Sequence, residues 1–228
     1  SGLPGASITL EYSAADFAIA QFALALGDNE NYFSLLQRSD NWQTLFNTSN
    51  GFIQPRYENG SWSSNFNSTF KEGFDDGTSS QYSWMVLHNL RGLFDKMGGN
   101  SAVIDRLDIF FTKLNDGTYS SHAYMGNEPS IQVPWEYNFA QTPSRSQEII
   151  RLIQTFLFTN APDGLPGNDD AGSMSSWYIF STLGIYPMIP GIGGFVVGTP
   201  LFNSVTLNIA DDFKLQINAN KIQSNVTK

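Results

Sequence analysis

The sequence of 228 residues contains no cysteine and only two histidines, His88 and His122. It therefore forms no disulfide, offers no thiolate and does not supply the usual ligand set of a zinc site. It also lacks the Gly-x-x-x-x-Gly-Lys phosphate loop and the strand–Gly-x-Ser-x-Gly–helix element of serine hydrolases. The last two absences argue against phosphate-loop binding and against serine hydrolase catalysis. We expect His88 to be a packed, hydrogen-bonded residue rather than a metal ligand.

Charge is also scarce. Charged residues make up 14% of the chain, against about 25% in a typical soluble domain. The 12 Lys and Arg residues are scattered and the formal net charge is −9, so the clustered basic surface that binds nucleic acid is missing. No apolar run approaches the roughly 18 residues of a membrane span. We therefore expect no nucleic-acid partner and no membrane span.

What the sequence does contain is a globular composition, with 41% hydrophobic and 14% aromatic residues. Apolar residues at helical spacing predict helices over residues 14–27, 30–46, 81–97, 101–114, 144–158 and 173–183. Short links between neighbours, such as Asp28-Asn29, indicate antiparallel helix hairpins. Long polar loops over residues 47–80, 115–136 and 159–170 separate these helices. Loops of such length are usually functional or disordered.

The composition changes after Gly184, where proline and glycine become frequent. Alternation of apolar and polar residues over 205–209 and 213–217 predicts β-strands. We therefore predict a mainly α fold. Residues 1–186 would form part of an (α/α)6-type toroid of helix hairpins whose long loops build an active-site cleft, and residues 187–228 a short β tail. The opening residues resemble a loop entered in mid-chain, so we expect the segment to come from a longer protein.

Acidic and amide residues gather in the three loops, each time just before a predicted helix. The clusters are Asp75-Asp76, Asn127-Glu128 and Asn168-Asp169-Asp170. An Asp before a helix is commonly only a cap, so each cluster taken alone has a structural explanation. Oxygen side chains such as Glu128, Asp169 and the amide of Asn127 also suit a hard cation such as calcium, although the spacing matches no EF-hand.

Aromatic residues crowd the same loops. Carboxylates interleaved with Trp and Tyr suit a sugar site, because ring faces pack on sugar C–H surfaces while carboxylates bind hydroxyls or perform acid–base work. We expect Trp84 and Trp135 to contact substrate in this way. The full set is Phe74, Tyr82, Trp84, Tyr124, Trp135, Tyr137 and Trp177.

At this point the residues resemble a known family. The segment GLPGNDDAGSMSSWY, residues 164–178, is similar to a motif of the α-mannosidases of glycoside hydrolase family 92. Three further stretches agree with the family in the same order. They are TLEY at residues 9–12 with the helix that follows, GFDDGTSSQYSWMVLHN at residues 73–89, and GNEPSIQVPWEYNF at residues 126–139.

The resemblance implies an exo-acting, inverting, calcium-dependent α-mannosidase that acts on mannose-containing glycans. It places the general base on Asp170, the general acid on Asp76 and the calcium loop on Asn127 and Glu128, with Asn168 and Asp169 beside the base as substrate-binding residues. It also implies an upstream β-sandwich domain of the same protein, absent from this chain, and a secreted, periplasmic or cell-surface location. The two carboxyl groups of an inverting pair should lie roughly 6.5–9.5 Å apart to admit the attacking water.

One departure from the family pattern bears on substrate choice. The matching position of the general acid is a glutamate in the family and Asp76 here, which moves the acidic proton about one C–C bond, ~1.5 Å, away. A mannose linked through a phosphodiester needs little acid assistance, so such a substrate is one alternative. An inactive or carbohydrate-binding family member is another. A polysaccharide lyase is a third, which the net charge of −9 disfavours.

Overall fold

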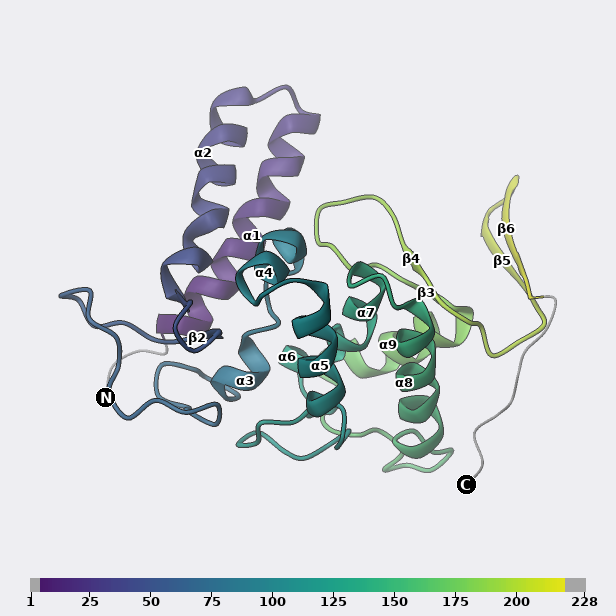
Figure 1. The fold of residues 1–228 in the computed structure, drawn as a ribbon. Helices are drawn as coiled ribbons and strands as arrows, with labels where there is room; N and C mark the ends of the chain where they lie inside the picture. The colour runs from purple at the N-terminus through teal and green to yellow at the C-terminus, as the bar shows by residue number, and fades with distance from the viewer. Residues whose placement is uncertain (1–4, 220–228) are drawn as a thin grey trace.

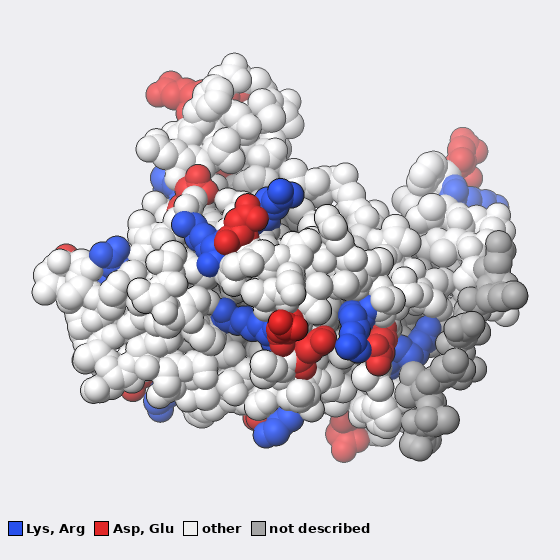
Figure 2. Space-filling model, in the orientation of Figure 1, with Lys and Arg blue, Asp and Glu red and all other residues white. Residues whose placement is uncertain are grey.

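The structure is a computed structural model and describes residues 5–219, which are mainly helical and end in a short β segment, as predicted (Figure 1). No helix in this range is long and apolar enough to cross a membrane. On the face drawn in Figure 2, positive and negative side chains are spread singly or in small mixed groups over a largely uncharged surface.

The first two helices form the predicted antiparallel hairpin, which stands at one end of the molecule in Figure 1. Helix α1 spans Gly5–Ala25 and α2 spans Asn29–Ser39. The turn between them is fixed by Asp28, whose carboxylate accepts a hydrogen bond from the backbone N–H of Asn31 at 3.1 Å and so caps α2. Arg38 of α2 pairs with the buried Asp16 of α1 at 3.1 Å. Small buried residues on α1, such as Ala20 and Ala23, allow the two helices to approach closely.

The helix predicted over 30–46 is shorter than expected, because α2 gives way to a 3-10 turn, η1 (Asp40–Leu45). A small hairpin of β1 (Phe46–Asn47) and β2 (Phe52–Ile53) follows. The long loop after it is ordered by the buried Gln54. The side-chain oxygen of Gln54 accepts hydrogen bonds from the side-chain amides of Asn47 and Asn50, both at 2.8 Å. The side-chain nitrogen of Gln54 donates to the backbone carbonyl of Ser63 at 2.8 Å.

The helix predicted over 81–97 is broken into three pieces. They are α3 (Ser79–Tyr82), the 3-10 turn η2 (Leu87–Asn89) and α4 (Leu90–Lys96). The break lies where Trp84 and Val86 turn fully into the core, with Val86 at the non-helical angles φ −117° and ψ 52°. A new helix start follows, because the side chain of Asn89 accepts a hydrogen bond from the backbone N–H of Gly92 at 3.0 Å.

The remaining helices complete the body. Helix α5 covers Asn100–Phe110, and the predicted loop 115–136 contains short helical turns in which proline is the second residue. Helix α9 has the predicted bounds and ends at Gly184, which adopts φ +73°. The other elements are α6 (Glu128–Ile131), η3 (Val133–Trp135), α7 (Glu136–Phe139), α8 (Pro143–Phe156) and α9 (Ser173–Leu183).

The β tail consists of two separate antiparallel pairs. Strands β3 (Ile185–Tyr186) and β4 (Val196–Val197) pair beside the helices. Strands β5 (Ser204–Ala210) and β6 (Phe213–Asn218) match the two predicted strands and form a hairpin apart from the helical body (Figure 1). The division of the chain at residues 186 and 187 stays a prediction.

Candidate active site

The first loop delivers Asp75 and Asp76 to the start of α3. Both carboxylates are exposed, and neither has a hydrogen-bond or ion-pair partner among residues 5–219. The backbone beneath them is fixed, because Thr78 and Gln81 form a reciprocal capping box. On the other side, the backbone N–H of Asp75 donates to the hydroxyl of Ser7 in α1 at 3.1 Å. The two aspartates therefore project from a firmly held backbone.

The second loop is attached directly to the first. The amide of Asn127 donates to the backbone carbonyl of Asp76 at 2.6 Å, and the hydroxyl of Thr78 donates to the carbonyl of Ser120 at 2.7 Å. Asn127 is only 5% exposed, which leaves its amide little freedom to choose another partner. The residue predicted to bind calcium thus also positions the residue predicted to be the general acid.

The second and third loops touch through their backbones. A Cβ on Gly126 would lie 2.9 Å from the Cα of Gly167, and a Cβ on Gly167 would overlap the carbonyl oxygen of Gly126. Only glycine fits at either position. Asn115 bridges the same two loops, since its amide donates to the carbonyl of Pro166 at 2.9 Å while its side-chain oxygen accepts from the N–H of Gly126 at 3.0 Å.

The third loop gives its two aspartates different roles. Asp169 caps α9, because its carboxylate accepts hydrogen bonds from the backbone N–H and the hydroxyl of Ser175 at 2.9 and 2.8 Å. The carboxylate of Asp170 makes no hydrogen bond or ion pair within residues 5–219. Asp170 and Ala171 adopt left-handed backbone angles, φ +47° and +54°. Such conformations are strained for residues other than glycine and cluster at functional sites.

Asn168 is exposed beside these residues. The predicted acid, base and calcium residues therefore lie on three loops that are joined in series, from the first to the second and from the second to the third. Nothing in the sequence indicated the two contacts between the second and third loops, which are the Asn115 bridge and the close approach of Gly126 and Gly167.

Carboxylates accumulate at the junction of α1 with the first two loops. Partial burial, followed by the negative charges of Asp75 and Glu128, raises the pKa of Glu11 above its usual value. Burial likewise raises the pKa of Tyr82 to about 12, next to the backbone of Asp76. Glu11 was not predicted as a site residue, because it lies on helix α1 and not on one of the three loops. The site thus carries unneutralised negative charge.

The donor set fits a hard cation. Glu128 is exposed with a carboxylate free of partners within the described range, and the side-chain oxygen of Asn127 accepts no hydrogen bond there. Two oxygen donors beside the carboxylates of Glu11 and Asp75 are the chemistry that calcium prefers. No group of three or more His, Cys, Asp or Glu residues that could hold a metal occurs among residues 5–219. Because calcium takes about six to eight oxygen ligands, water or other parts of the protein would have to supply the rest.

The structure corrects the role predicted for Trp84 and Trp135. Both are 0% exposed, so neither offers a ring face to a sugar. Trp84 packs against Phe110 with ring centroids 5.9 Å apart, and Trp135 stacks on Tyr186 at 5.0 Å. The physical reason is that these indoles fill the space between helices below the loops, where their apolar area is removed from water. Most of the other aromatic residues of the predicted set are also buried, namely Phe74, Tyr82, Tyr137 and Trp177.

His88 behaves as a structural residue. The Nε2 of His88 lies 2.9 Å from the carbonyl of Ser39, and its ring packs 5.5 Å from Phe17. Burial lowers the pKa of His88. The prediction of a packed, hydrogen-bonded His88 is confirmed.

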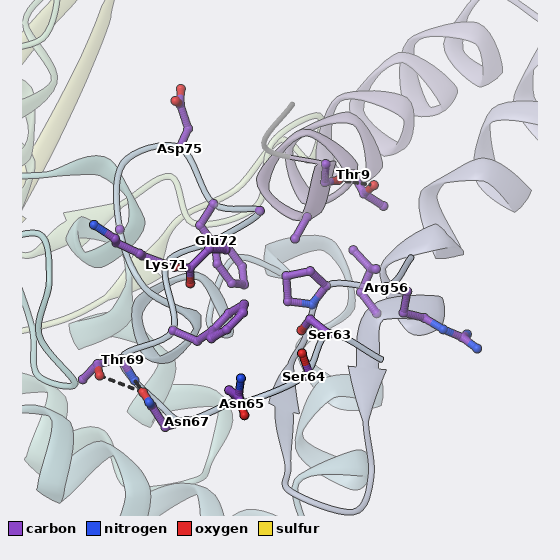
Figure 3. Close-up of a pocket in the computed structure, with 18 of the residues that line it drawn as sticks. Thr9, Arg56, Ser63, Ser64, Asn65, Asn67, Thr69, Lys71, Glu72 and Asp75 are labelled. Carbon is purple, nitrogen blue, oxygen red and sulfur yellow. Dashed lines mark hydrogen bonds between the residues drawn. The ribbon is translucent and has the colours of Figure 1, made fainter. Parts of the chain in front are cut away.

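A cavity of about 1180 Å³ lies beside the first loop, between this loop and the start of α1 (Figure 3). Phe70, Phe74 and Pro55 form its apolar floor, and polar side chains such as Asn67 and Thr69 line the rest. Asp75 is at one edge and points away from the other labelled residues in Figure 3. Tyr119 lines the same cavity, is 68% exposed and has the Lys71 ammonium 4.8 Å from its ring centroid. Tyr119 is thus an aromatic residue that can meet a ligand, which the buried tryptophans cannot.

Comparison with known proteins identifies the family of the chain. The family model described as the glycosyl hydrolase family 92 catalytic domain matches residues 4–228. A curated relative from Arthroderma benhamiae, named an uncharacterized secreted glycosidase, is 31% identical, with 88% of this chain and 28% of the relative covered.

Two solved structures from Bacteroides thetaiotaomicron are also similar. One is a family GH92 α-mannosidase in complex with mannoimidazole, with a TM-score of 0.88, 29% identity, and 97% of this chain and 31% of that chain covered. The other is described as a family GH92 inverting mannosidase, with a TM-score of 0.84, 31% identity, and 96% and 32% covered.

The chain therefore belongs to glycosyl hydrolase family 92 and forms part of its catalytic domain. It spans 28% to 32% of the length of these relatives.

Proposed function

We propose that the protein containing this chain is an exo-acting, inverting α-mannosidase that removes terminal α-linked mannose from glycans. The observation that carries the proposal is the pair of partner-free carboxylates, Asp76 and Asp170, on loops joined through Asn127, Asn115 and the Gly126–Gly167 contact. Membership of a glycoside hydrolase family and structural similarity to α-mannosidases support the substrate class.

The reaction is a single displacement. Asp76 donates its proton to the glycosidic oxygen while the bond from that oxygen to C1 breaks. Asp170 accepts a proton from a water molecule, whose oxygen forms the new bond to C1 from the opposite face and inverts the anomeric centre. A base without competing hydrogen bonds suits this role, whereas Asp169 is engaged as the cap of α9.

Calcium fits the proposal as a resident ion held in part by Asn127 and Glu128. When bound, it would polarise the sugar hydroxyls or the attacking water. Asn127 has a second task within the chain, because its amide holds the backbone of Asp76. Glu128 supplies a negative charge next to the carboxyl groups of Glu11 and Asp75.

The remaining part of the site is proposed to come from an upstream β-sandwich domain of the same protein. A secreted, periplasmic or cell-surface location is proposed as well, supported by the relative that is named a secreted glycosidase. Mannose-containing glycans are the substrates that such a location would offer.

The role of Asp76 can be tested with substrates that differ in leaving group. Asp76→Asn in the whole protein should slow cleavage of a mannose–mannose linkage by about 10²-fold or more, because a sugar alkoxide leaves poorly without a proton. The same variant should hardly change the hydrolysis of an aryl mannoside with an activated phenol. An equal loss on both substrates would remove Asp76 from the role of general acid.

The shortened acid makes a mannose phosphodiester a second candidate substrate. A phosphate needs little protonation to leave, and Asp76 has one methylene fewer than the glutamate of the family pattern. Wild-type kcat/KM should be compared on a mannosyl phosphodiester and a mannose disaccharide, and on both with Asp76→Glu. A gain on the disaccharide would show that the short side chain limits that reaction. No turnover of any mannoside would favour a binding protein instead.

The calcium proposal is tested by binding rather than by activity alone. Glu128→Ala should weaken calcium affinity in titration calorimetry of the whole protein, since the ion loses a charged ligand. Glu58→Ala is the control, because Glu58 is exposed on the first loop and has no partner within the described residues. Identical calcium affinity in the wild type and Glu128→Ala would exclude Glu128 as a ligand.

A further inference from the structure

The first long loop carries three Asn-x-Ser/Thr triplets within a short stretch, and none has proline in the middle. They begin at Asn47, Asn59 and Asn67. Such triplets are acceptors for N-linked glycans when they lie on the surface of a secreted protein. The structure shows that the three asparagines differ in what their amides do.

Asn59 and Asn67 are exposed and share one conformation. In each, the side-chain oxygen accepts hydrogen bonds from the backbone N–H and the hydroxyl of the residue two positions later. The distances are 3.0 and 2.7 Å from Ser61 to Asn59, and 2.9 and 2.8 Å from Thr69 to Asn67. The amide nitrogen of each residue has no hydrogen-bond partner among residues 5–219 and faces solvent.

Asn47 is different, because it belongs to β1 and is only half-exposed. Its amide nitrogen donates to the side-chain oxygen of Gln54 at 2.8 Å, and Gln54 is 4% exposed. Its side-chain oxygen accepts from the backbone N–H of Ser49 at 2.9 Å. Both polar atoms of Asn47 are therefore used to fold the hairpin and to order the loop.

We propose that Asn59 and Asn67 carry N-linked glycans and that Asn47 does not. The inference rests on the proposed secreted location, in a host that transfers oligosaccharides from a lipid pyrophosphate donor. The amide nitrogen forms a bond to C1 of the first N-acetylglucosamine. The bond from C1 to the pyrophosphate oxygen breaks, the lipid pyrophosphate leaves, and the amide loses one proton.

The position of Asn67 gives this modification a consequence for the site. Asn67 lines the cavity of about 1180 Å³ that also borders Asp75, and Figure 3 shows it hydrogen-bonded to Thr69 at the edge opposite Asp75. A glycan at Asn67 would begin at the edge of this cavity, whereas a glycan at Asn59 would begin on a turn that does not line it. Removal of the Asn67 glycan is therefore expected to change KM for large glycan substrates, with no such change for removal at Asn59.

The test is site occupancy in the whole protein secreted from a yeast host. Enzymatic deglycosylation in heavy-oxygen water marks each occupied asparagine as a labelled aspartate, and peptide mass spectrometry then reads all three sites. We expect label at Asn59 and Asn67 and none at Asn47. An unlabelled Asn59 or Asn67 would overturn the proposal for that site, and a labelled Asn47 would overturn the selectivity.

Matched variants separate acceptor recognition from folding. Thr69→Ala should abolish label at Asn67, while Ser68→Ala should keep it, because the middle residue of the triplet is not read. Retained label in Thr69→Ala would overturn the assignment. The amount of protein in the medium and the activity on an aryl mannoside are measured separately. An inactive but glycosylated protein would count against the proposed function alone, and an active, secreted but unglycosylated one against this inference alone.

Discussion

The three loops and the layer beneath them place carboxylates in opposite environments. On the loops, Asp76 and Glu128 are exposed and lack partners within the described residues, so water solvates their carboxyl groups. Below, Glu136 at the start of α7 is 0% exposed, and neither of its side-chain oxygens has a hydrogen-bond partner among the described residues. Burial raises its pKa well above the usual range, and the positive charge of Arg106 only partly opposes this effect.

The comparison separates reactive groups from supporting groups. A partner-free carboxylate costs little in water and can bind an ion, a sugar or a proton, whereas a buried one is costly and contributes only to the structure around it. The aromatic rings follow the same division, because Trp84 and Trp135 are buried in the lower layer and Tyr119 is exposed in the upper one. The candidate site thus consists of exposed carboxyl groups on the loops above a layer of buried aromatic rings. The variants below test that division.

The largest effect is expected at the third loop. Asp170→Asn should lower kcat by about 10²–10⁴-fold, because an amide cannot accept the proton of the attacking water. Asp169→Asn is the matched control, since an amide oxygen can still accept the hydrogen bonds of Ser175 and cap α9. Steady-state kinetics with a mannoside would check both. A large loss of kcat in Asp169→Asn with little loss in Asp170→Asn would exchange the two roles, and a raised KM in Asp169→Asn alone would show that Asp169 binds substrate.

The second effect concerns the lower layer. Trp135→Ala should reduce the free energy of unfolding by about 3–5 kcal/mol, as for other large-to-small changes in a core. Tyr119→Ala should change it by less than about 0.5 kcal/mol, because the ring is largely exposed. Chemical denaturation of the whole protein would measure both. If Trp135→Ala leaves stability unchanged and raises KM, the indole is a substrate contact after all.

Much of the fold followed from the sequence. Periodicity and the Gly184 stop gave α9 its bounds, and alternation found β5 and β6, because these signals are local. The break between α3 and α4 was missed, since it depends on Trp84 and Val86 turning into a core that other helices build. A local pattern does not reveal which side of a segment is covered by residues far along the chain.

The loop positions of the candidate site residues were predictable for the same reason, while their catalytic and calcium-binding roles stay predictions. The acidic clusters before helices marked the three loops, and Asp76, Asp170, Asn127 and Glu128 lie on them. The roles of the aromatic residues were not predictable, because the same sequence pattern of a Trp near a carboxylate occurs in hydrophobic cores and in sugar-binding sites. The difference between Asp169 and Asp170 was equally hidden, since it is set by left-handed backbone angles at a single turn.

A third, smaller effect is expected at the contact between loops. Gly167→Ala should cost about 1–3 kcal/mol of stability and reduce activity, because the new Cβ overlaps the carbonyl oxygen of Gly126 and pushes the base loop away from the second loop. Gly193→Ala is the control, since a Cβ there meets nothing within 4 Å. Thermal unfolding and kcat would be measured together. Wild-type activity in Gly167→Ala would show that the close approach is not needed to hold the catalytic groups.

The last effect, smallest when expressed per pH unit, is a pH dependence of stability that belongs to Glu136. In the unfolded chain this group titrates near its ordinary pKa of 4.5, and in the folded protein burial raises the pKa well above that value. Above pH 4.5 the unfolded state therefore binds fewer protons than the folded state, so stability falls as the pH rises until the folded group itself ionises. The slope should reach about 1.4 kcal/mol per pH unit at most. Glu136→Gln should remove this decline, because an amide does not titrate, while Glu58→Gln on the exposed first loop should leave it in place. Urea unfolding of the three proteins at several pH values between about 4.5 and 7 would measure the difference. Parallel curves for wild type and Glu136→Gln would show that Glu136 is charged in the folded protein, and the contrast between the two layers would then not extend to their carboxylates.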